Sequence, residues 1–145
     1  MKVFLDADAS PVTDIVIKVC ENLHFELIIV KNFSQQIYSD YPTIVNVDIS
    51  PESADLYIVN HLDPFDLVIT QDRGLSALCL SKRAYVMDFF GSSIDESNIE
   101  LHLATRHANR VLRDQGIYSK NKKRKQKDNS AFEVNFKRFL EDKTI

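Results

Sequence analysis

The sequence predicts an α/β fold with a mostly parallel central sheet flanked by helices. Apolar runs of four to seven residues, which are typical of buried strands, alternate with segments whose apolar residues recur at helical spacing. The 145 residues are 44% hydrophobic and 27% charged, which is the balance of one compact domain with a core of its own. The same composition excludes a disordered or fibrous protein.

The predicted elements alternate between strand and helix along the chain. The expected strands cover residues 3–6, 25–30, 44–47, 66–70 and 85–89, and the expected helices cover residues 11–23, 51–62, 72–83 and 95–115. Ser50 and Pro51 suit the N-cap and the first position of the second helix, and Gly116 suits the end of the last one. A loop or a short irregular helix is expected over 32–42, and a turn over 91–93.

The C-terminal part is predicted to differ from the α/β domain, which we assign to residues 1–118. Residues 119–130 contain six Lys and Arg and no apolar residue, so a basic flexible segment is expected there. A short helix is expected over 131–145. It places Phe132, Phe136 and Phe139 on one face, which must be buried within this chain or in a homodimer.

Charge divides the chain into an acidic and a basic part. Residues 1–100 contain 6 Lys and Arg and 16 Asp and Glu, a charge of −10, whereas residues 101–145 contain 12 and 5, a charge of +7. A basic region next to an acidic domain suits a nucleic-acid partner, for which we expect RNA rather than DNA. An ordinary solvated helix face is the alternative explanation for part of this charge. The expected nucleic-acid contacts are Arg106, Arg110, Arg113, Lys122, Lys123, Arg124 and Lys125.

Several carboxylates lie where the predicted strands end. Asp6 and Asp8 end the first strand, and their i, i+2 spacing directs both side chains the same way. Because ligands of parallel sheets bind beyond the carboxyl ends of the strands, the other acids at this edge are candidates as well. These are Asp48, Asp55 and Asp72. Carboxylates brought together repel one another unless a cation neutralises them, so the sequence predicts a site for Mg²⁺ or Mn²⁺.

Structural roles compete with this prediction at some of the acids. Asp72 is a good N-cap for the helix that follows it, Asp48 suits the turn before Ser50, and Asp66 is expected to be a turn residue. Asp6 and Asp8 are harder to explain structurally, because two carboxylates at the end of an apolar strand lose hydration without an evident return.

The two cysteines and the N-terminus bear on location. Cys20 and Cys79 each lie inside a helical pattern, so buried thiols are expected rather than a disulfide. No apolar stretch is long enough for a signal peptide or a membrane span. We therefore expect a cytoplasmic protein without a membrane partner.

Three segments together carry a resemblance to a known family. They are residues 6–12 (DADASPV), 55–59 (DLYIV) and 66–75 (DLVITQDRGL), and they resemble the YaiI/YqxD family of uncharacterised bacterial proteins. That family is similar to PIN-domain nucleases, and the resemblance covers about residues 1 to 116. It implies a PIN-like fold and metal-dependent hydrolysis of RNA or DNA. In that scheme Asp6, Asp55 and Asp72 resemble the nuclease acids, and Asp8 adds a ligand or orients water. Two positions depart from the family pattern: Ser10 stands where Cys is common, and Phe65 stands where Gly is usual.

Three functions remain open at this point. The first is a metal-dependent nuclease with catalytic residues Asp6, Asp8, Asp55 and Asp72. The second is a non-catalytic RNA-binding protein in which the carboxylates hold a structural ion. The third is a phosphatase resembling the haloacid dehalogenases, in which Asp6 is the nucleophile and Asp8 the general acid.

Overall fold

The structure is a computed structural model of the chain, and it describes residues 1–100, 107–108, 110–112, 115–116 and 123–144. Nine of the 21 residues of the helix predicted over 95–115, including Arg106 and Arg113, lie outside these residues, as does Lys122. The described strands are β1 (Lys2–Asp6), β2 (Glu26–Asn32), β3 (Thr43–Val47), β4 (Leu67–Ile69), β5 (Tyr85–Met87) and β6 (Ser93–Ile94). The helices with defined bounds are α1 (Thr13–Leu23), α2 (Pro51–His61), α3 (Arg73–Ser81) and α5 (Gln126–Asp142).

The strands form one sheet in the order β3-β2-β1-β4-β5-β6. Every pairing is parallel except that of β5 with β6, so the predicted mostly parallel α/β fold is confirmed. The chain moves outward from β1 to β2 and β3, and then returns to the other side of β1 with β4. The order of the strands therefore reverses between β1 and β4, and in open sheets this reversal opens a crevice at the carboxyl ends.

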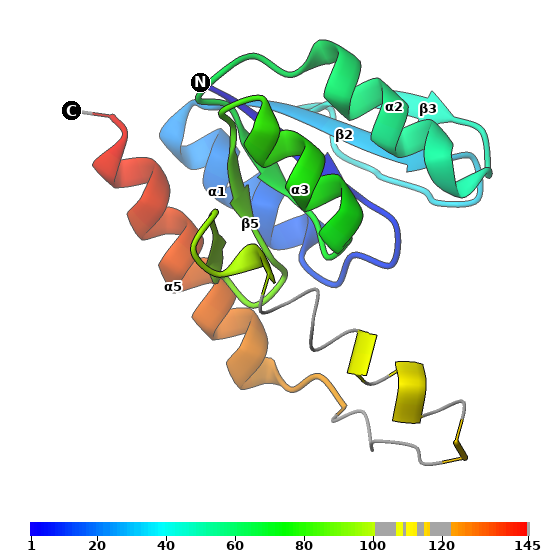
Figure 1. Cartoon of the computed structure of the whole chain (residues 1–145). Helices are drawn as coiled ribbons and strands as arrows, with labels where there is room; N and C mark the ends of the chain where they lie inside the picture. The colour runs from blue at the N-terminus through cyan, green and yellow to red at the C-terminus, as the bar shows by residue number, and fades with distance from the viewer. Residues whose placement is uncertain (101–106, 109, 113–114, 117–122, 145) are drawn as a thin grey trace.

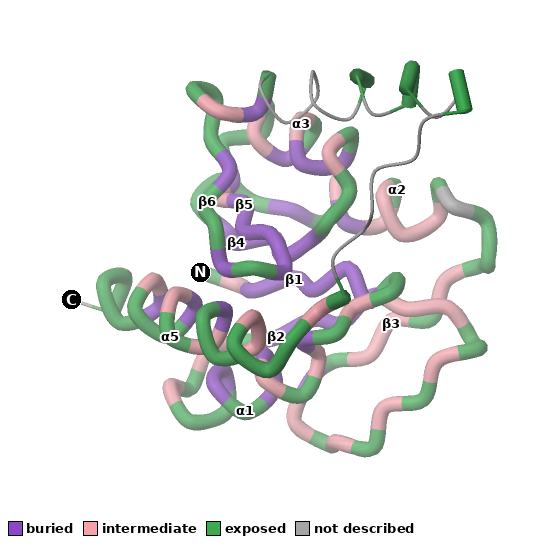
Figure 2. Tube along the Cα trace, turned by 90° about the horizontal axis from the view of Figure 1, so that it is seen from below, coloured by how far each residue is buried: buried purple, intermediate pink, exposed green. Residues whose placement is uncertain are grey.

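Helices cover both faces of the sheet (Figure 1). The helices α1 and α5 lie on one face, where Val16, Cys20, Phe132 and Phe136 join the sheet in a core. The helices α2 and α3 lie on the other face, where Ile58 and other apolar side chains form a second core. Buried residues gather along the strands between these two layers (Figure 2).

The C-terminal helix begins earlier than predicted. It starts at Gln126, so residues 126–130, which we expected in the flexible segment, are helical. Its first turn is capped, because Asp128 Oδ2 accepts a hydrogen bond from the backbone N–H of Lys125 at 2.8 Å. The aromatic face packs within one chain: Phe132 and Phe136 are fully buried. Two of the three aromatic side chains are thus buried without a second chain, and Phe139 is partly buried against the same core.

The segment after β5 also differs from the prediction. A turn was expected over 91–93, but Ser93 pairs with Met87 as part of the antiparallel strand β6. Gly91 makes the turn, with φ of +85°, and α5 passes so close that a Cβ there would lie 2.8 Å from Asn135 Cβ. Among the described residues, no helix combines the length and the apolar character needed to cross a membrane.

Candidate functional site

All five predicted carboxylates line one cleft, which we call the acid cleft. It has a volume of about 320 Å³ and lies at the carboxyl edge of the sheet, next to the reversal between β1 and β4. Its carboxylates are Asp6, Asp8, Asp48, Asp55 and Asp72. The fold thus brings together residues that are up to 66 positions apart in the sequence, as expected from the rule that ligands bind at the ends of parallel strands.

Asp6 lies at the base of the acid cleft and is only 6% exposed. Its Oδ2 accepts a hydrogen bond from Thr70 Oγ1 at 2.9 Å, and its Oδ1 accepts one from the backbone N–H of Asp8 at 3.3 Å. Thr70 Oγ1 in turn accepts a hydrogen bond from the backbone N–H of Asp72 at 3.0 Å. The threonine hydroxyl therefore fixes one orientation of Asp6 and links it to the acid that follows β4.

Asp72 performs the structural role that the sequence suggested. Its Oδ1 accepts a hydrogen bond from the backbone N–H of Leu75 at 3.0 Å, which caps α3. The side chain nevertheless lines the acid cleft. Capping and a functional role do not exclude each other here, since a carboxylate has two oxygens with several acceptor sites. The cap also holds the side chain in a fixed place.

Burial and neighbouring negative charges raise the pKa values of two acids in the cleft, Asp6 and Asp55. Burial raises the pKa of Asp6, and the negative charges of Asp8 and Asp72 raise it further, while the hydrogen bond from Thr70 opposes the shift. Burial raises the pKa of Asp55 to about 6, and Asp72 and Asp6 contribute to the shift. The cleft thus holds negative charge that the protein leaves largely uncompensated.

The carboxylates line a common cleft without forming a finished ligand set. In the part of the chain that the structure describes, no three side chains of His, Cys, Asp or Glu are arranged closely enough to hold a metal ion. Like charges without a cation between them favour separation. The donor chemistry suits Mg²⁺ or Mn²⁺, because the cleft offers carboxylate and amide oxygens and neither thiol nor imidazole.

Four polar residues that line the acid cleft were not predicted from the sequence as site residues. Gln71 is held by the backbone N–H of Phe89, which donates to its Oε1 at 3.0 Å. Lys31 brings a positive charge to the cleft wall, where its Nζ donates to the carbonyl of Gln35 at 2.7 Å. Asn32 and Gln35 complete this wall. Asn32 is the last residue of β2, and Gln35 lies in residues 33–42, where no periodic pattern marked it as part of a site.

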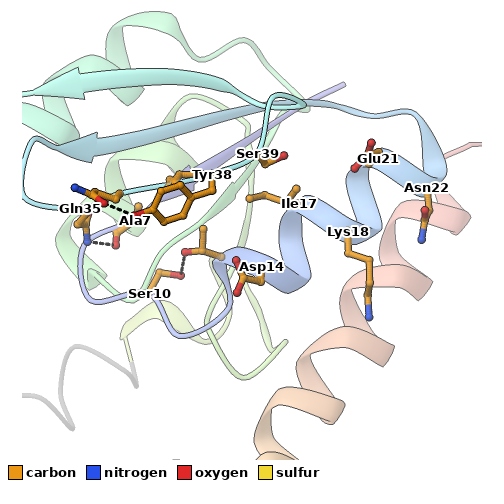
Figure 3. Close-up of a pocket in the computed structure, with 13 residues that line it drawn as sticks. Ala7, Ser10, Asp14, Ile17, Lys18, Glu21, Asn22, Gln35, Tyr38 and Ser39 are labelled. Atoms are coloured by element: carbon orange, nitrogen blue, oxygen red, sulfur yellow. Dashed lines mark hydrogen bonds between the residues drawn. The ribbon is translucent and has the colours of Figure 1, made fainter.

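A second cavity, which we call the α1 groove, adjoins the acid cleft. It has a volume of about 690 Å³ and lies between α1 and residues 35–39 (Figure 3). Gln35 lines both cavities. At the end of β1 the chain separates them: Asp6 and Asp8 face the acid cleft, and Ala7 between them faces the α1 groove.

The predicted nucleic-acid residues divide into distinct groups. Arg124 binds the protein itself, since its guanidinium donates to the carbonyl of Phe89 and to Asn129 Oδ1, both at 2.7 Å. It also lies over the ring of Phe90, 5.0 Å from the centroid. Lys123, Lys125 and Arg110 are exposed. Arg106, Arg113 and Lys122 lie outside the described residues.

The buried thiols are confirmed. Cys20 and Cys79 are both free and fully buried, and burial raises the pKa of each thiol to about 12. They lie in different cores, on opposite faces of the sheet, so they cannot pair. A thiol that resists ionisation in this way is unreactive and serves as a small apolar side chain.

The fold and the site define the class: an open, mostly parallel α/β protein with an acidic cleft where the strand order reverses. Comparison with known sequences gives the family. The chain belongs to the YaiI/YqxD family, described as "Uncharacterized BCR", whose family model matches residues 4–142. This membership confirms the resemblance seen in the three sequence segments.

The similar proteins share nearly the whole length of the chain. A "UPF0178 protein" of Natranaerobius thermophilus is 41% identical over 98% of this chain and 95% of its own length. Proteins of the same name from Alkaliphilus oremlandii and Exiguobacterium sibiricum are each 34% identical, and cover 94% and 99% of their own lengths. No solved structure gives a significant match.

Proposed function

We propose that this protein is a divalent-metal-dependent nuclease whose active site is the acid cleft. The observation that carries the proposal is the environment of Asp6, a buried carboxylate whose nearest charged neighbours are other carboxylates. Such an arrangement costs free energy in the folded protein, and a bound divalent cation would relieve that cost. The resemblance to PIN-domain nucleases supports phosphodiester hydrolysis as the reaction.

The residues that would hold Mg²⁺ or Mn²⁺ are Asp6, Asp55 and Asp72, with the assistance of Asp8 and Asp48, which line the same cleft. Bound there, the cation would act as a Lewis acid that polarises a phosphoryl oxygen and makes water a better nucleophile. Thr70 positions Asp6, and the α3 cap positions Asp72. Both acids are thus oriented in advance, which lowers the cost of ordering them around a cation.

The substrate in this proposal is a nucleic acid, with RNA favoured over DNA. The exposed Arg110, Lys123 and Lys125 supply positive charge for phosphate contacts outside the cleft. Arg124 does not take part, because its guanidinium is used in anchoring α5. The cytoplasm is the proposed location, since both cysteines are buried thiols, as in proteins of reducing compartments.

Metal binding is the first test, since it does not require the right substrate. Thermal unfolding is measured against increasing Mn²⁺ and Mg²⁺ for the wild type and for Asp6→Asn. We expect the midpoint to rise with metal concentration in the wild type and to stay constant in the variant, because a ligand of the folded state stabilises it. The matched control is Asp66→Asn, another buried aspartate, which lies outside the acid cleft and should keep the metal response.

Cleavage is then assayed with labelled RNA and DNA at the metal concentration that stabilises the wild type. We expect Asp6→Asn to lose at least about 100-fold in rate, since a ligand of the metal is removed. A metal response without cleavage of any substrate would instead favour the non-catalytic RNA-binding function. No metal response at millimolar Mn²⁺ would overturn the proposal.

A further inference from the structure

The α1 groove is lined by hydrogen-bonding groups, and its one lysine is already paired with a glutamate. Its polar lining includes Thr13, Asn22, Gln35 and Gln36, and its apolar lining includes Ile17 and Ile37. The charges at its wall come from α1: Asp14 and Glu21 are negative, and Lys18 forms an ion pair with Glu133 at 2.7 Å. Phosphate would be repelled here. An uncharged planar group with several polar atoms suits this lining better.

Tyr38 provides an aromatic surface at the mouth of this groove. Its side chain is 90% exposed, and its hydroxyl donates a hydrogen bond to Gln36 Oε1, so the ring is oriented without being covered (Figure 3). The far end of the segment is also fixed, because the Tyr41 hydroxyl donates to the carbonyl of Phe25. An oriented and exposed aromatic ring is the kind of surface on which nucleobases stack.

Gln35 connects the groove with the acid cleft and has an unused acceptor. Its Nε2 donates to the carbonyl of Ala7 at 2.7 Å, which fixes the orientation of the amide (Figure 3). Its Oε1 is buried and accepts no hydrogen bond from any described residue. A buried acceptor without a donor is unfavourable, and the N–H groups of a nucleobase are donors of the required kind.

We propose that the α1 groove binds a nucleobase of a single-stranded nucleic acid, next to the phosphodiester that lies in the acid cleft. The base stacks on Tyr38, and a shift of the Gln35 side chain lets its unused acceptor Oε1 receive a hydrogen bond from the base. The position of the neighbouring phosphodiester rests on the proposed nuclease function; the base site does not. A base held in this way has left its stack, so the protein prefers single strands to duplexes.

The test measures by fluorescence anisotropy how tightly the protein binds a fluorescein-labelled single-stranded RNA. An RNA of about 12 nucleotides is long enough to fill the binding site of a small domain. Ca²⁺ replaces Mg²⁺ because it accepts the same oxygen ligands, and a denaturing gel verifies that the RNA stays intact. We expect Tyr38→Ala to weaken binding about tenfold, the usual effect of losing one stacked base. Tyr38→Phe should weaken it by less than about threefold, because the stacking ring is kept and only the hydrogen bond that orients it is lost.

Phe33→Ala is the matched control. Phe33 lies in the same segment and is 69% exposed, but it lines neither cavity, so its removal should change the affinity by less than about twofold. A duplex of the same sequence should bind more weakly than the single strand. An abasic strand of the same length should bind Tyr38→Ala and the wild type equally, because no base is left to stack. A DNA strand of the same sequence separates RNA from DNA preference.

The base site would be overturned if Tyr38→Ala and the wild type bound the RNA equally well. It would also be overturned if Phe33→Ala lost as much affinity as Tyr38→Ala, or if Tyr38→Ala bound the abasic strand as much more weakly than the wild type as it binds the intact RNA. Cleavage assayed in parallel separates this outcome from failure of the nuclease function. If the base site alone is wrong, Asp6→Asn still abolishes cleavage while Tyr38→Ala cleaves like the wild type. If the nuclease function alone is wrong, Tyr38→Ala weakens base-dependent binding although no variant cleaves.

Discussion

Two buried aspartates at opposite ends of the sheet show how differently one residue type is used in this protein. Asp66, which is 3% exposed, lies at the amino end of β4, and Asp6 lies at the carboxyl end of β1. The two oxygens of Asp66 accept hydrogen bonds from the backbone N–H groups of Lys2, at 2.8 Å, and Asp63, at 2.9 Å. The Lys2 ammonium lies 3.6 Å away and balances the charge.

Asp6 also accepts two hydrogen bonds, but its charge is not balanced. The charges that act on it come from Asp8 and Asp72. Burial alone therefore does not mark a functional acid, because both aspartates are equally removed from water. The distinguishing property is whether the surrounding residues compensate the charge, and only at Asp6 is that compensation left for a ligand to provide.

The largest expected effect is a loss of stability on replacing Asp66, the aspartate whose charge is compensated. Asp66→Ala removes the acceptors of two backbone N–H groups and the partner of a partly buried ammonium, so the free energy of unfolding should fall by roughly 2–4 kcal/mol. Asp6→Asn should change it by less than about 1 kcal/mol in EDTA, because lost hydrogen bonding is offset by relief of repulsion. Urea denaturation at neutral pH measures both. An equal loss in the two variants would remove the distinction.

The next effect concerns the hydroxyl that holds Asp6. Thr70→Val removes one hydrogen bond to Asp6 and leaves the backbone N–H of Asp72 without its acceptor, which should lower the free energy of unfolding by about 1–2 kcal/mol. It should also raise the pKa of Asp6 further, because the lost bond stabilised the carboxylate. The pH dependence of metal binding reports this shift, and Thr70→Ser should restore the wild-type profile. An unchanged profile in Thr70→Val would contradict the role given to the hydroxyl.

The smallest effect follows from the raised pKa of Asp55. The folded state keeps a proton on Asp55 up to about pH 6, whereas the unfolded chain releases it near 3.8. Between these values the folded state binds more protons, so the free energy of unfolding falls as pH rises through this window. The loss should be about 1 kcal/mol, since Asp55 is half-exposed and solvent screens its interactions.

Urea denaturation of the wild type and of Asp55→Asn in EDTA, from about pH 4.5 to 8, isolates this contribution. The difference in unfolding free energy between the two proteins should change across the window and then level off. Saturating Mg²⁺ should reverse the loss above pH 6, because a cation binds the charged form. A difference that is constant with pH would show that burial and the neighbouring acids do not raise the pKa of Asp55.

The sequence predicted those parts of the molecule that depend on local pattern and on the geometry of parallel sheets. Asp6, Asp55 and Asp72 were found because the ends of parallel strands, and the helices that follow them, meet at one edge. Asp66 was correctly assigned to a turn, where its Oδ2 accepts from the N–H of Asp63. No such rule applies to residues 33–42, so Gln35 and its position between two cavities were not predictable.

Long-range contacts explain the remaining differences. Arg124 was counted as a nucleic-acid contact because it lies in a basic run, and nothing in that run shows that it bonds to the carbonyl of Phe89. The same contact anchors the chain just before α5, which starts earlier than the apolar pattern alone suggested. The strand β6 has only two residues, Ser93 and Ile94, and a pattern of that length does not distinguish a strand from a turn.

The position of α5 has a consequence for the order in which the protein is made. Phe132, Phe136 and Leu140 are fully buried in the core that covers α1 and one face of the sheet. Until residue 140 has left the ribosome, α1 alone covers that apolar face, although every described strand has already been synthesised. Folding of this domain therefore finishes only after α5 has been translated, and until then the emerging chain exposes apolar surface that is prone to aggregation.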